Sequence, residues 1–389
     1  MKPLFLTIKR FKCFESLKLQ INNLTVLTGK NSVGKSSITQ AIRLLRQAAT
    51  STAKPAQIHL NGTGFQLGTY DDILNRNSVK VSGESFGIGL SESATNSNLV
   101  EFRPAEDSDE CEFVRASMLD TPVLENKSSW YFTYLSAERY GPRLHQERID
   151  GHRSTKVGVG AKGEFSAEVL ANSHTTRIDE RLVHPSSTVP SSVLPSSSSS
   201  VLNTLLNRNL EKWLSSIVGE FEIRASRPPR LANPMLEFRK IGAESEWQFP
   251  TNHGFGVSYT LPIILAGLLL EENGFLIVDS PEAHLHPAAQ TALAIFLARV
   301  AACGRTVIVE THSDHIIDGF RLAIADQTHP IAAADSIFYY LDQSDNGKIV
   351  HHDISPRPNG SLPKWPKGFF DQVATNLRSL SKLTTKNGA

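Results

Sequence analysis

An eight-residue loop near the N-terminus constrains the fold more than any other feature of the sequence. Residues 29–36 read Gly-Lys-Asn-Ser-Val-Gly-Lys-Ser and match the phosphate-binding pattern G-x-x-x-x-G-K-[ST] in full. The glycines let backbone N–H groups surround phosphates, Lys35 supplies charge to the β- and γ-phosphates, and the Ser36 hydroxyl can ligate Mg²⁺. The pattern predicts ATP and Mg²⁺ as cofactors and these nucleotide-binding residues: Gly29, Lys30, Asn31, Ser32, Val33, Gly34, Lys35, Ser36 and Ser37.

The segments on either side of the loop support this interpretation. Residues 24–27 form an apolar stretch typical of a buried strand, and apolar residues at helical spacing begin near Ser36. A strand, a glycine loop and a helix in this order are the context that phosphate binding requires. An ordinary glycine-rich turn with a surface lysine would explain the loop but not its flanks.

A second motif places a carboxylate at the end of a strand. Residues 275–287 read Phe-Leu-Ile-Val-Asp-Ser-Pro-Glu-Ala-His-Leu-His-Pro. An acid directly after a short apolar strand lies at the carboxyl edge of a parallel sheet, where α/β proteins bind ligands. With a phosphate loop in the same chain, we expect Asp279 and Ser36 to hold Mg²⁺. Taken alone, Asp279 could equally be a solvated strand end.

A third motif brings a histidine to the same edge. Residues 306–315 read Thr-Val-Ile-Val-Glu-Thr-His-Ser-Asp-His, so His312 follows another buried strand. This position fits a sensor of the γ-phosphate, and a purely structural histidine is the alternative.

A fourth, weaker motif precedes a long apolar helix. Residues 252–258 read Asn-His-Gly-Phe-Gly-Val-Ser. Gly254, Gly256 and Ser258 at a helix N-terminus can form an anion site through the backbone dipoles. A plain helix-capping turn explains the pattern equally well.

The order of strands and helices predicts an α/β fold of the P-loop NTPase type. We expect a mostly parallel central sheet flanked by helices, with a β-rich N-terminal part and an inserted helical lobe. A Ser-rich tract, residues 186–200, predicts a mobile linker, and residues 201–218 predict an amphipathic helix. The expected parts are an N-terminal ATPase lobe (1–144), the inserted lobe (145–250), a second ATPase lobe (251–325) and a C-terminal segment (326–389).

Composition limits the partners and the compartment. Forty Lys and Arg residues face 39 Asp and Glu residues, for a formal charge of +1, which disfavours tight binding along nucleic-acid phosphates. The three cysteines are far apart and fit a reducing compartment. The longest apolar run, residues 261–270, is too short to cross a bilayer. These features predict a cytoplasmic protein without a membrane partner.

Taken together, the motifs resemble those of the ABC-type ATPases of the SMC, RecF and OLD group. The resemblance covers residues 8–322 and looks closest to small OLD-like ATPases with a C-terminal domain of unknown function, many of them in prokaryotic defence loci. Residues 134–143 and 365–371 add to it. It implies that Asp279 is the Walker B acid and His312 the switch histidine.

The resemblance also implies an oligomer. Gly254, Gly256 and Ser258 would form a signature loop that contacts the γ-phosphate bound by the other subunit. Two chains would then sandwich two ATP molecules in a homodimer, or within a higher homo-oligomer. Phe11, Lys12 and Phe14 lie where the group often places residues near the base and phosphates.

One residue departs from the transport-type members of this group. The position after the Walker B acid, where they carry a catalytic glutamate, is Ser280, which cannot act as a base near neutral pH. The next carboxylate is Glu282, and we expect it to position the attacking water while His312 contacts the γ-phosphate. The alternatives are that Glu282 caps a helix or forms an ion pair, and that the protein is a slow, nucleotide-gated clamp.

The resemblance therefore implies an ATP-hydrolysing, dimerising ATPase that relays a signal to a separate effector, a nuclease or toxin, in anti-phage defence. The segment after the switch helix has few acids, so we expect no nuclease module there. A RecF-like, DNA-engaging repair ATPase and a non-hydrolysing nucleotide-gated scaffold are the alternatives.

Overall fold

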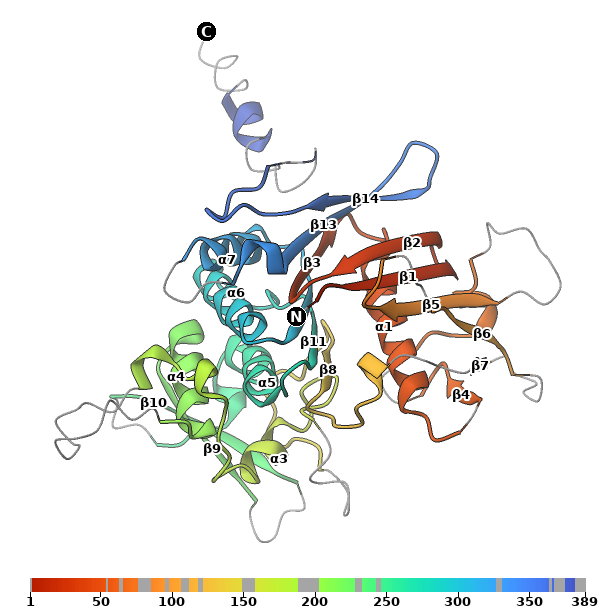
Figure 1. The fold of residues 1–389 in the computed structure, drawn as a ribbon. Coiled ribbons are helices and arrows are strands. Elements are labelled where there is room, and N and C mark those ends of the chain that lie inside the picture. Colours follow the sequence, from red (N-terminus) through yellow and green to blue (C-terminus); the bar gives the residue numbers. More distant parts are fainter. Residues whose placement is uncertain are drawn as a thin grey trace, which may run out of the picture.

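The computed structural model shows a central sheet with an N-terminal antiparallel sheet on one side of it and a group of helices and a smaller lobe on the other (Figure 1). It describes residues 2–53, 55–62, 66–75, 85–94, 98–105, 112–117, 122–148, 158–187, 203–227, 233–242, 246–326, 331–363, 366 and 375–381.

The central sheet has six strands in the order β14-β13-β3-β12-β11-β8. All neighbours pair in parallel except β13 and β14, so the prediction of a mostly parallel sheet is confirmed. The strands are β3 (Leu24–Gly29), β8 (Phe132–Leu135), β11 (Phe275–Asp279), β12 (Thr306–Glu310), β13 (Ser336–Gln343) and β14 (Ile349–Ile354).

Helices cover both faces of this sheet. The P-loop leads from β3 directly into α1 (Lys35–Thr50), and the opposite face carries α5 (Phe255–Leu269), α6 (Pro287–Ala302) and α7 (Asp314–Ala325) (Figure 1). Helix α6 begins with Pro287, which is pre-organised for the first helical position. The Ser313 side chain caps α7 by accepting a hydrogen bond from the backbone N–H of Ile316.

The N-terminal part is β-rich, as expected. Its sheet is antiparallel, in the order β2-β1-β5-β6-β7-β4, and it packs on the same side of the molecule as α1 (Figure 1). The elements of this part are β1 (Leu4–Phe11), β2 (Phe14–Ile21), β4 (Ala56–His59), α2 (Tyr70–Ile73), β5 (Phe86–Ser91), β6 (Val100–Pro104) and β7 (Phe113–Ala116).

The central strands are apolar along their length because both of their faces are buried. Successive side chains of a strand point to opposite faces. In β11, Leu276 and Val278 pack in the core formed with α5, α6 and α7, whereas Phe275 and Ile277 pack in the core formed with α1 and the antiparallel sheet. Unbroken apolar runs are what a parallel sheet covered on two sides requires.

The inserted lobe contains helices, as expected, and also a pair of strands. Its elements are α3 (Ser166–Ala171), α4 (Leu206–Val218), β9 (Phe221–Ser226) and β10 (Met235–Lys240), and β9 and β10 pair in an antiparallel hairpin. The expected amphipathic helix is α4, although it begins at Leu206 rather than at 201. Of the Ser-rich tract, residues 188–200 lie outside the described residues.

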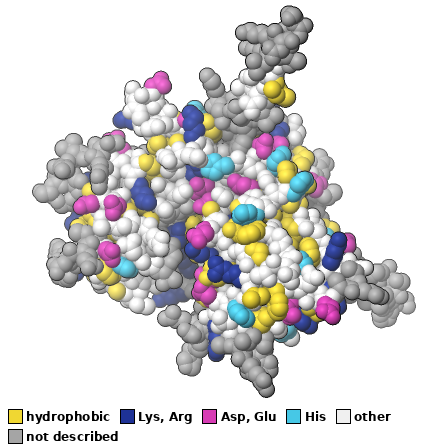
Figure 2. Space-filling model, turned by 180° about the vertical axis from the view of Figure 1, so that it is seen from behind, with side chains coloured by type: hydrophobic (Ala, Val, Ile, Leu, Met, Phe, Trp, Pro, Cys, Tyr) yellow, Lys and Arg dark blue, Asp and Glu magenta, His cyan; other side chains and the backbone are white. Residues whose placement is uncertain are grey.

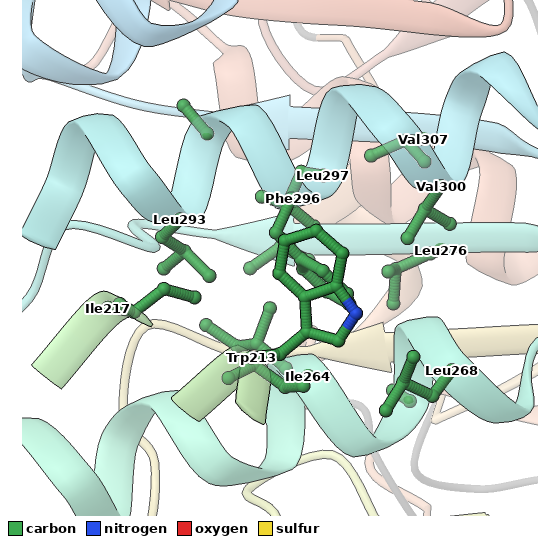
Figure 3. Packing of buried hydrophobic residues seen from close by; sticks show 14 of the residues in the cluster. Trp213, Ile217, Ile264, Leu268, Leu276, Leu293, Phe296, Leu297, Val300 and Val307 are labelled. Atoms are coloured by element: carbon green, nitrogen blue, oxygen red, sulfur yellow. The ribbon is translucent and has the colours of Figure 1, made fainter. Parts of the chain in front are cut away.

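Helix α4 joins the lobe to the central core through an aromatic side chain. Trp213 packs against Phe296 of α6, with ring centroids 5.1 Å apart, and Ile264, Leu293 and Leu297 surround the pair (Figure 3). The indole Nε1–H donates to the carbonyl of Leu182 at 2.9 Å, so the polar atom of this buried ring is satisfied.

The C-terminal segment is part of the central sheet. Strand β13 pairs with β3 over Ser336–Leu341, and β14 pairs with β13. The sheet therefore continues across the expected boundary at 325/326. Most of residues 365–371 lie outside the described residues. Among the helices that the structure describes, none is both long and apolar enough to span a membrane.

Surface charges of both signs are interspersed. On the face drawn in Figure 2, Lys and Arg side chains lie among Asp and Glu side chains. In the inserted lobe, Arg224 pairs with Glu237 and Arg227 with Glu168. This distribution matches the near-zero formal charge of the chain.

Candidate functional site

The two glycines of the P-loop are required by backbone geometry. Gly29 has φ +141° and Gly34 has φ +91°, values that side chains rarely tolerate. A Cβ atom at Gly29 would lie 2.1 Å from the carbonyl oxygen of Leu341, and one at Gly34 would lie 2.4 Å from Cys13 Sγ. The loop can therefore follow its path between β13 and the β1–β2 turn only with glycine at both positions.

A cavity of about 440 Å³ opens at the loop and lies at the carboxyl edge of the parallel sheet. Its lining residues are Lys12, Cys13, Asn31, Ser32, Gly34, Lys35, Ser36, Ser37, Glu310 and His312. Most of the expected nucleotide-binding residues thus line this cavity. The Val33 side chain instead packs into the core, and Lys30 points to Asp342 in an ion pair of 2.8 Å.

The two polar side chains that end the P-loop are held by different partners. Lys35 is buried, and its Nζ donates to the carbonyl oxygens of Gly29 at 3.2 Å and Lys30 at 2.6 Å. Burial lowers the pKa of Lys35, an effect opposed by the nearby carboxylates of Glu310 and Asp279. Ser36 Oγ donates to Oε1 of Glu310 at 2.9 Å.

Glu310 is a site residue that the sequence analysis did not single out. It ends β12 directly beside Asp279, which ends β11 in the parallel register. Burial, and then the neighbouring Asp279, raise the pKa of Glu310 to about 7, and burial also raises the pKa of Asp279. Glu310 belongs to the third sequence motif, residues 306–315, but only the strand pairing reveals that it lies next to Asp279.

A buried arginine braces the turn that follows Asp279. Arg139 is 3% exposed and donates to three carbonyl oxygens, those of Ser136 at 2.7 Å, Asp279 at 2.8 Å and Ser280 at 2.7 Å. Burial lowers its pKa to about 10. The turn is strained, because Ser280 has φ +46°, a left-handed conformation that is costly for a residue other than glycine. Arg139 belongs to residues 134–143, a stretch that adds to the family resemblance but whose single residues had no role assigned from the sequence.

Ser280 stabilises the acid before it. Its Oγ donates to Oδ1 of Asp279 at 3.0 Å, and its backbone N–H donates to the carbonyl of Glu310 at 2.8 Å. Both contacts tie the end of β11 to the end of β12.

Both carboxylate oxygens of Glu282 accept hydrogen bonds from the loop that carries His312. Thr311 Oγ1 donates to Oε2 at 2.8 Å, and the backbone N–H of His312 donates to Oε1 at 2.8 Å. Partial burial and the charge of Lys35 lower the pKa of His312, while Glu282 and Asp279 oppose this shift. His312 is therefore close enough to interact electrostatically with Lys35, Glu282 and Asp279.

The residues of the expected signature loop do not line the P-loop cavity of their own chain. Gly254 caps α5, and Gly256 and Ser258 lie in its first turns. Gly254 and Gly256 line a separate cavity of about 330 Å³, together with His253, His284 and apolar residues of α4 and α6. Within one chain, the fold thus brings the P-loop together with Asp279, Glu282 and His312, while the signature residues do not line the same cavity.

The donor set of the P-loop cavity suits a hard divalent cation accompanied by phosphates. Ser36 and Glu310 line the cavity, and Asp279 is paired with Glu310 on the neighbouring strand, so together they offer one hydroxyl and two carboxylates, the oxygen ligands that Mg²⁺ prefers. In the described part of the chain, no three His, Cys, Asp or Glu side chains form a metal-binding group. A cation at this position would therefore need phosphate oxygens to complete its ligands.

Comparisons with known proteins identify a protein family whose model matches this chain. A family model described as an AAA ATPase domain matches residues 1–116 and 196–317, more than half of the chain. A second model, described as a protein of unknown function (DUF3696), matches residues 331–380. Comparison with curated proteins gives no match.

Several solved structures are similar at low identity. An Smc head domain with an extended coiled coil, bound to the C-terminal domain of ScpA and derived from Pyrococcus furiosus, is 13% identical, with 98% of each chain covered and a TM-score of 0.49. An SmcHead bound to the C-winged helix domain of ScpA is 14% identical, with 91% of this chain and 98% of that chain covered and a TM-score of 0.47. The SMC head domain from Thermotoga maritima is 13% identical, with 90% and 98% covered and a TM-score of 0.42.

Proposed function

The chain belongs to the AAA ATPase domain family, and from this premise we propose that its P-loop cavity binds ATP with Mg²⁺ and hydrolyses it. The observation that carries the proposal is the meeting of Lys35, Ser36, Glu310 and His312 in one cavity at the carboxyl edge of the sheet. These residues come from two segments that lie far apart in the sequence, the P-loop and the end of β12, so their convergence is a property of the fold.

Each residue has a role that follows from its position. Lys35 exchanges the carbonyls of Gly29 and Lys30 for the β- and γ-phosphates, and Ser36 and Asp279 hold Mg²⁺. The bound cation neutralises phosphate charge. Glu282 orients the attacking water, and His312 contacts the γ-phosphate.

A second candidate function is a nucleotide-gated scaffold, in which ATP binding rather than turnover changes the state of the protein. Two observations favour it. Ser280 occupies the position after the Walker B acid, and both oxygens of Glu282 already accept hydrogen bonds from Thr311 and His312. A carboxylate so engaged must release a contact, or share an oxygen, before it can orient water.

Single-turnover hydrolysis separates the two candidates. Purified protein in excess over labelled ATP and Mg²⁺ is sampled for ADP, with Lys35→Ala as the background. ADP release well above that background supports the ATPase. ATP binding without ADP release overturns hydrolysis and supports the scaffold, and the absence of any ATP binding overturns both.

The proposal includes a dimer that closes around ATP. Gly254, Gly256 and Ser258 do not line the P-loop cavity of their own chain, so a partner chain would have to bring its signature residues to that cavity. Each site would then be built from two chains, and closure would report the presence of ATP to a separate effector, a nuclease or toxin.

The defence role rests on the sequence resemblance and has its own test. Cells carrying the gene with its neighbours are challenged with phages, alongside cells carrying Lys35→Ala. Protection that depends on Lys35 supports a relay in anti-phage defence. Equal plaque formation with and without the genes refutes that role, and DNA-stimulated hydrolysis would point to a RecF-like repair ATPase instead.

A further inference from the structure

Glu310 has a buried oxygen with no partner. The side chain is 5% exposed and lines the P-loop cavity. Its Oε1 accepts a hydrogen bond from Ser36, but Oε2 has no hydrogen-bond partner among the residues that the structure describes. An unpaired buried carboxylate oxygen is costly, and a positively charged ligand would remove that cost.

A second carboxylate lies next to it. Asp279 and Glu310 are paired residues on adjacent parallel strands, which run about 4.8 Å apart. The backbone N–H of Ser280 donates to the carbonyl of Glu310 and fixes the two strand ends together. Two neighbouring carboxylates repel each other, and a cation between them turns this repulsion into attraction.

We propose that Glu310 is a second carboxylate of the metal site, which holds the divalent cation of the bound nucleotide together with Ser36 and Asp279. The inference rests on the proposed nucleotide binding and adds a residue to it. Mg²⁺ in nucleotide sites is bound by one or two carboxylates plus phosphates, and the Ser36 hydroxyl already points at Glu310. Glu310 would therefore act on the cation itself through its unpartnered Oε2, in addition to holding the Ser36 hydroxyl through Oε1.

The surrounding charges make the cation depend on the nucleotide. The charge of Lys35 acts on both Asp279 and Glu310, and we expect Lys35 to contact the phosphates when a nucleotide binds. When Lys35 moves toward the phosphates, it no longer compensates the negative charge of Asp279 and Glu310, and the divalent cation can do so instead. We therefore expect Mg²⁺ and nucleotide to bind with strong mutual enhancement, and Glu310 to be part of that coupling.

The test measures binding rather than turnover. A fluorescent ADP analogue is titrated into wild type and Glu310→Gln, in EDTA and in saturating Mg²⁺. In EDTA the two proteins should bind the analogue within about twofold of each other. The gain in affinity on adding Mg²⁺ should fall about 10–100-fold in the variant, the range found when a metal-supporting residue is removed. Asp314→Asn, a carboxylate four residues along the chain that does not line the cavity, is the control and should keep the wild-type gain.

The outcomes are separable. A wild-type Mg²⁺ gain in Glu310→Gln overturns the inference, since Glu310 would then only brace Ser36. Failure of the wild type to bind the analogue in either buffer overturns the proposed function instead. If Glu310→Gln does not fold, Glu310→Asp is measured in the same way. Its shorter side chain keeps the negative charge but places the carboxylate farther from the proposed cation. A reduced gain in that variant supports the inference, and an unchanged gain overturns it.

Discussion

At the level of single residues, we expect nucleotide affinity to depend most directly on Lys35. Its Nζ is held by the carbonyls of Gly29 and Lys30, ready to turn to phosphate oxygens. We expect Lys35→Ala to abolish ATP binding, because no other side chain of the loop supplies that charge to the β- and γ-phosphates. Fluorescent ATP titration measures the loss, and circular dichroism checks the fold. Undiminished affinity would contradict the assignment of the P-loop.

Glu282 is the residue that we propose positions the attacking water. We expect Glu282→Gln to keep ATP affinity and to lose hydrolysis by about 10²–10⁴-fold, the usual contribution of a general base. We also expect it to accumulate the closed dimer. Single-turnover ADP release measures the effect, and a rate within threefold of wild type would mean that Glu282 only supports the loop.

Thr311→Val is the matched control for that experiment. It removes the hydroxyl that donates to Oε2 of Glu282 and leaves the carboxylate in place. If Glu282 acts on water, Thr311→Val should reduce the rate far less than Glu282→Gln. Equal losses in the two variants would assign Glu282 to fixing the His312 loop.

At the level of elements, Arg139 ties the strand end of β8 to the turn after β11. It donates to the carbonyls of Ser136, Asp279 and Ser280. Arg139→Met leaves these acceptors without their donor, at a cost of about 1–3 kcal/mol for each buried group left unsatisfied. We expect a loss of about 3 kcal/mol in the free energy of unfolding, measured by urea denaturation.

The nearby Arg143 gives a control for Arg139. Its guanidinium lies over the Tyr140 ring, 3.7 Å from the centroid, and it holds no backbone carbonyl of the β11 turn. We expect Arg143→Met to change the free energy of unfolding by less than about 1 kcal/mol, as for an exposed cation–π contact. If both arginine variants lost similar free energies of unfolding, the hydrogen bonds of Arg139 to the turn after β11 would not be the source of its contribution to stability.

At the level of the whole molecule, the expected dimer depends on the first turns of α5. We expect Ser258→Arg to leave ATP binding unchanged, because Ser258 does not line the P-loop cavity of its own chain. A bulky cation should block closure of two chains through steric and charge conflict. Light scattering with ATP measures the dimer, and closed dimers formed by Ser258→Arg would contradict the role of the signature loop.

The sequence by itself determined the fold class and most of the candidate site. The P-loop, the strand before Asp279 and the strand before His312 are local patterns, since period and composition over a few residues set strands, turns and helix starts. The P-loop glycines were predicted for the same reason, and the structure shows the left-handed backbone and close packing that require them.

Only the tertiary structure decided which of these segments are neighbours. Glu310 adjoins Asp279 and meets Ser36, 274 residues away in the chain, because β12 lies between β3 and β11. Arg139 reaches the Asp279 turn because β8 pairs with β11. Uniformly apolar strands do not encode their order in a sheet, so the second carboxylate and the arginine brace depend on how the strands and helices pack.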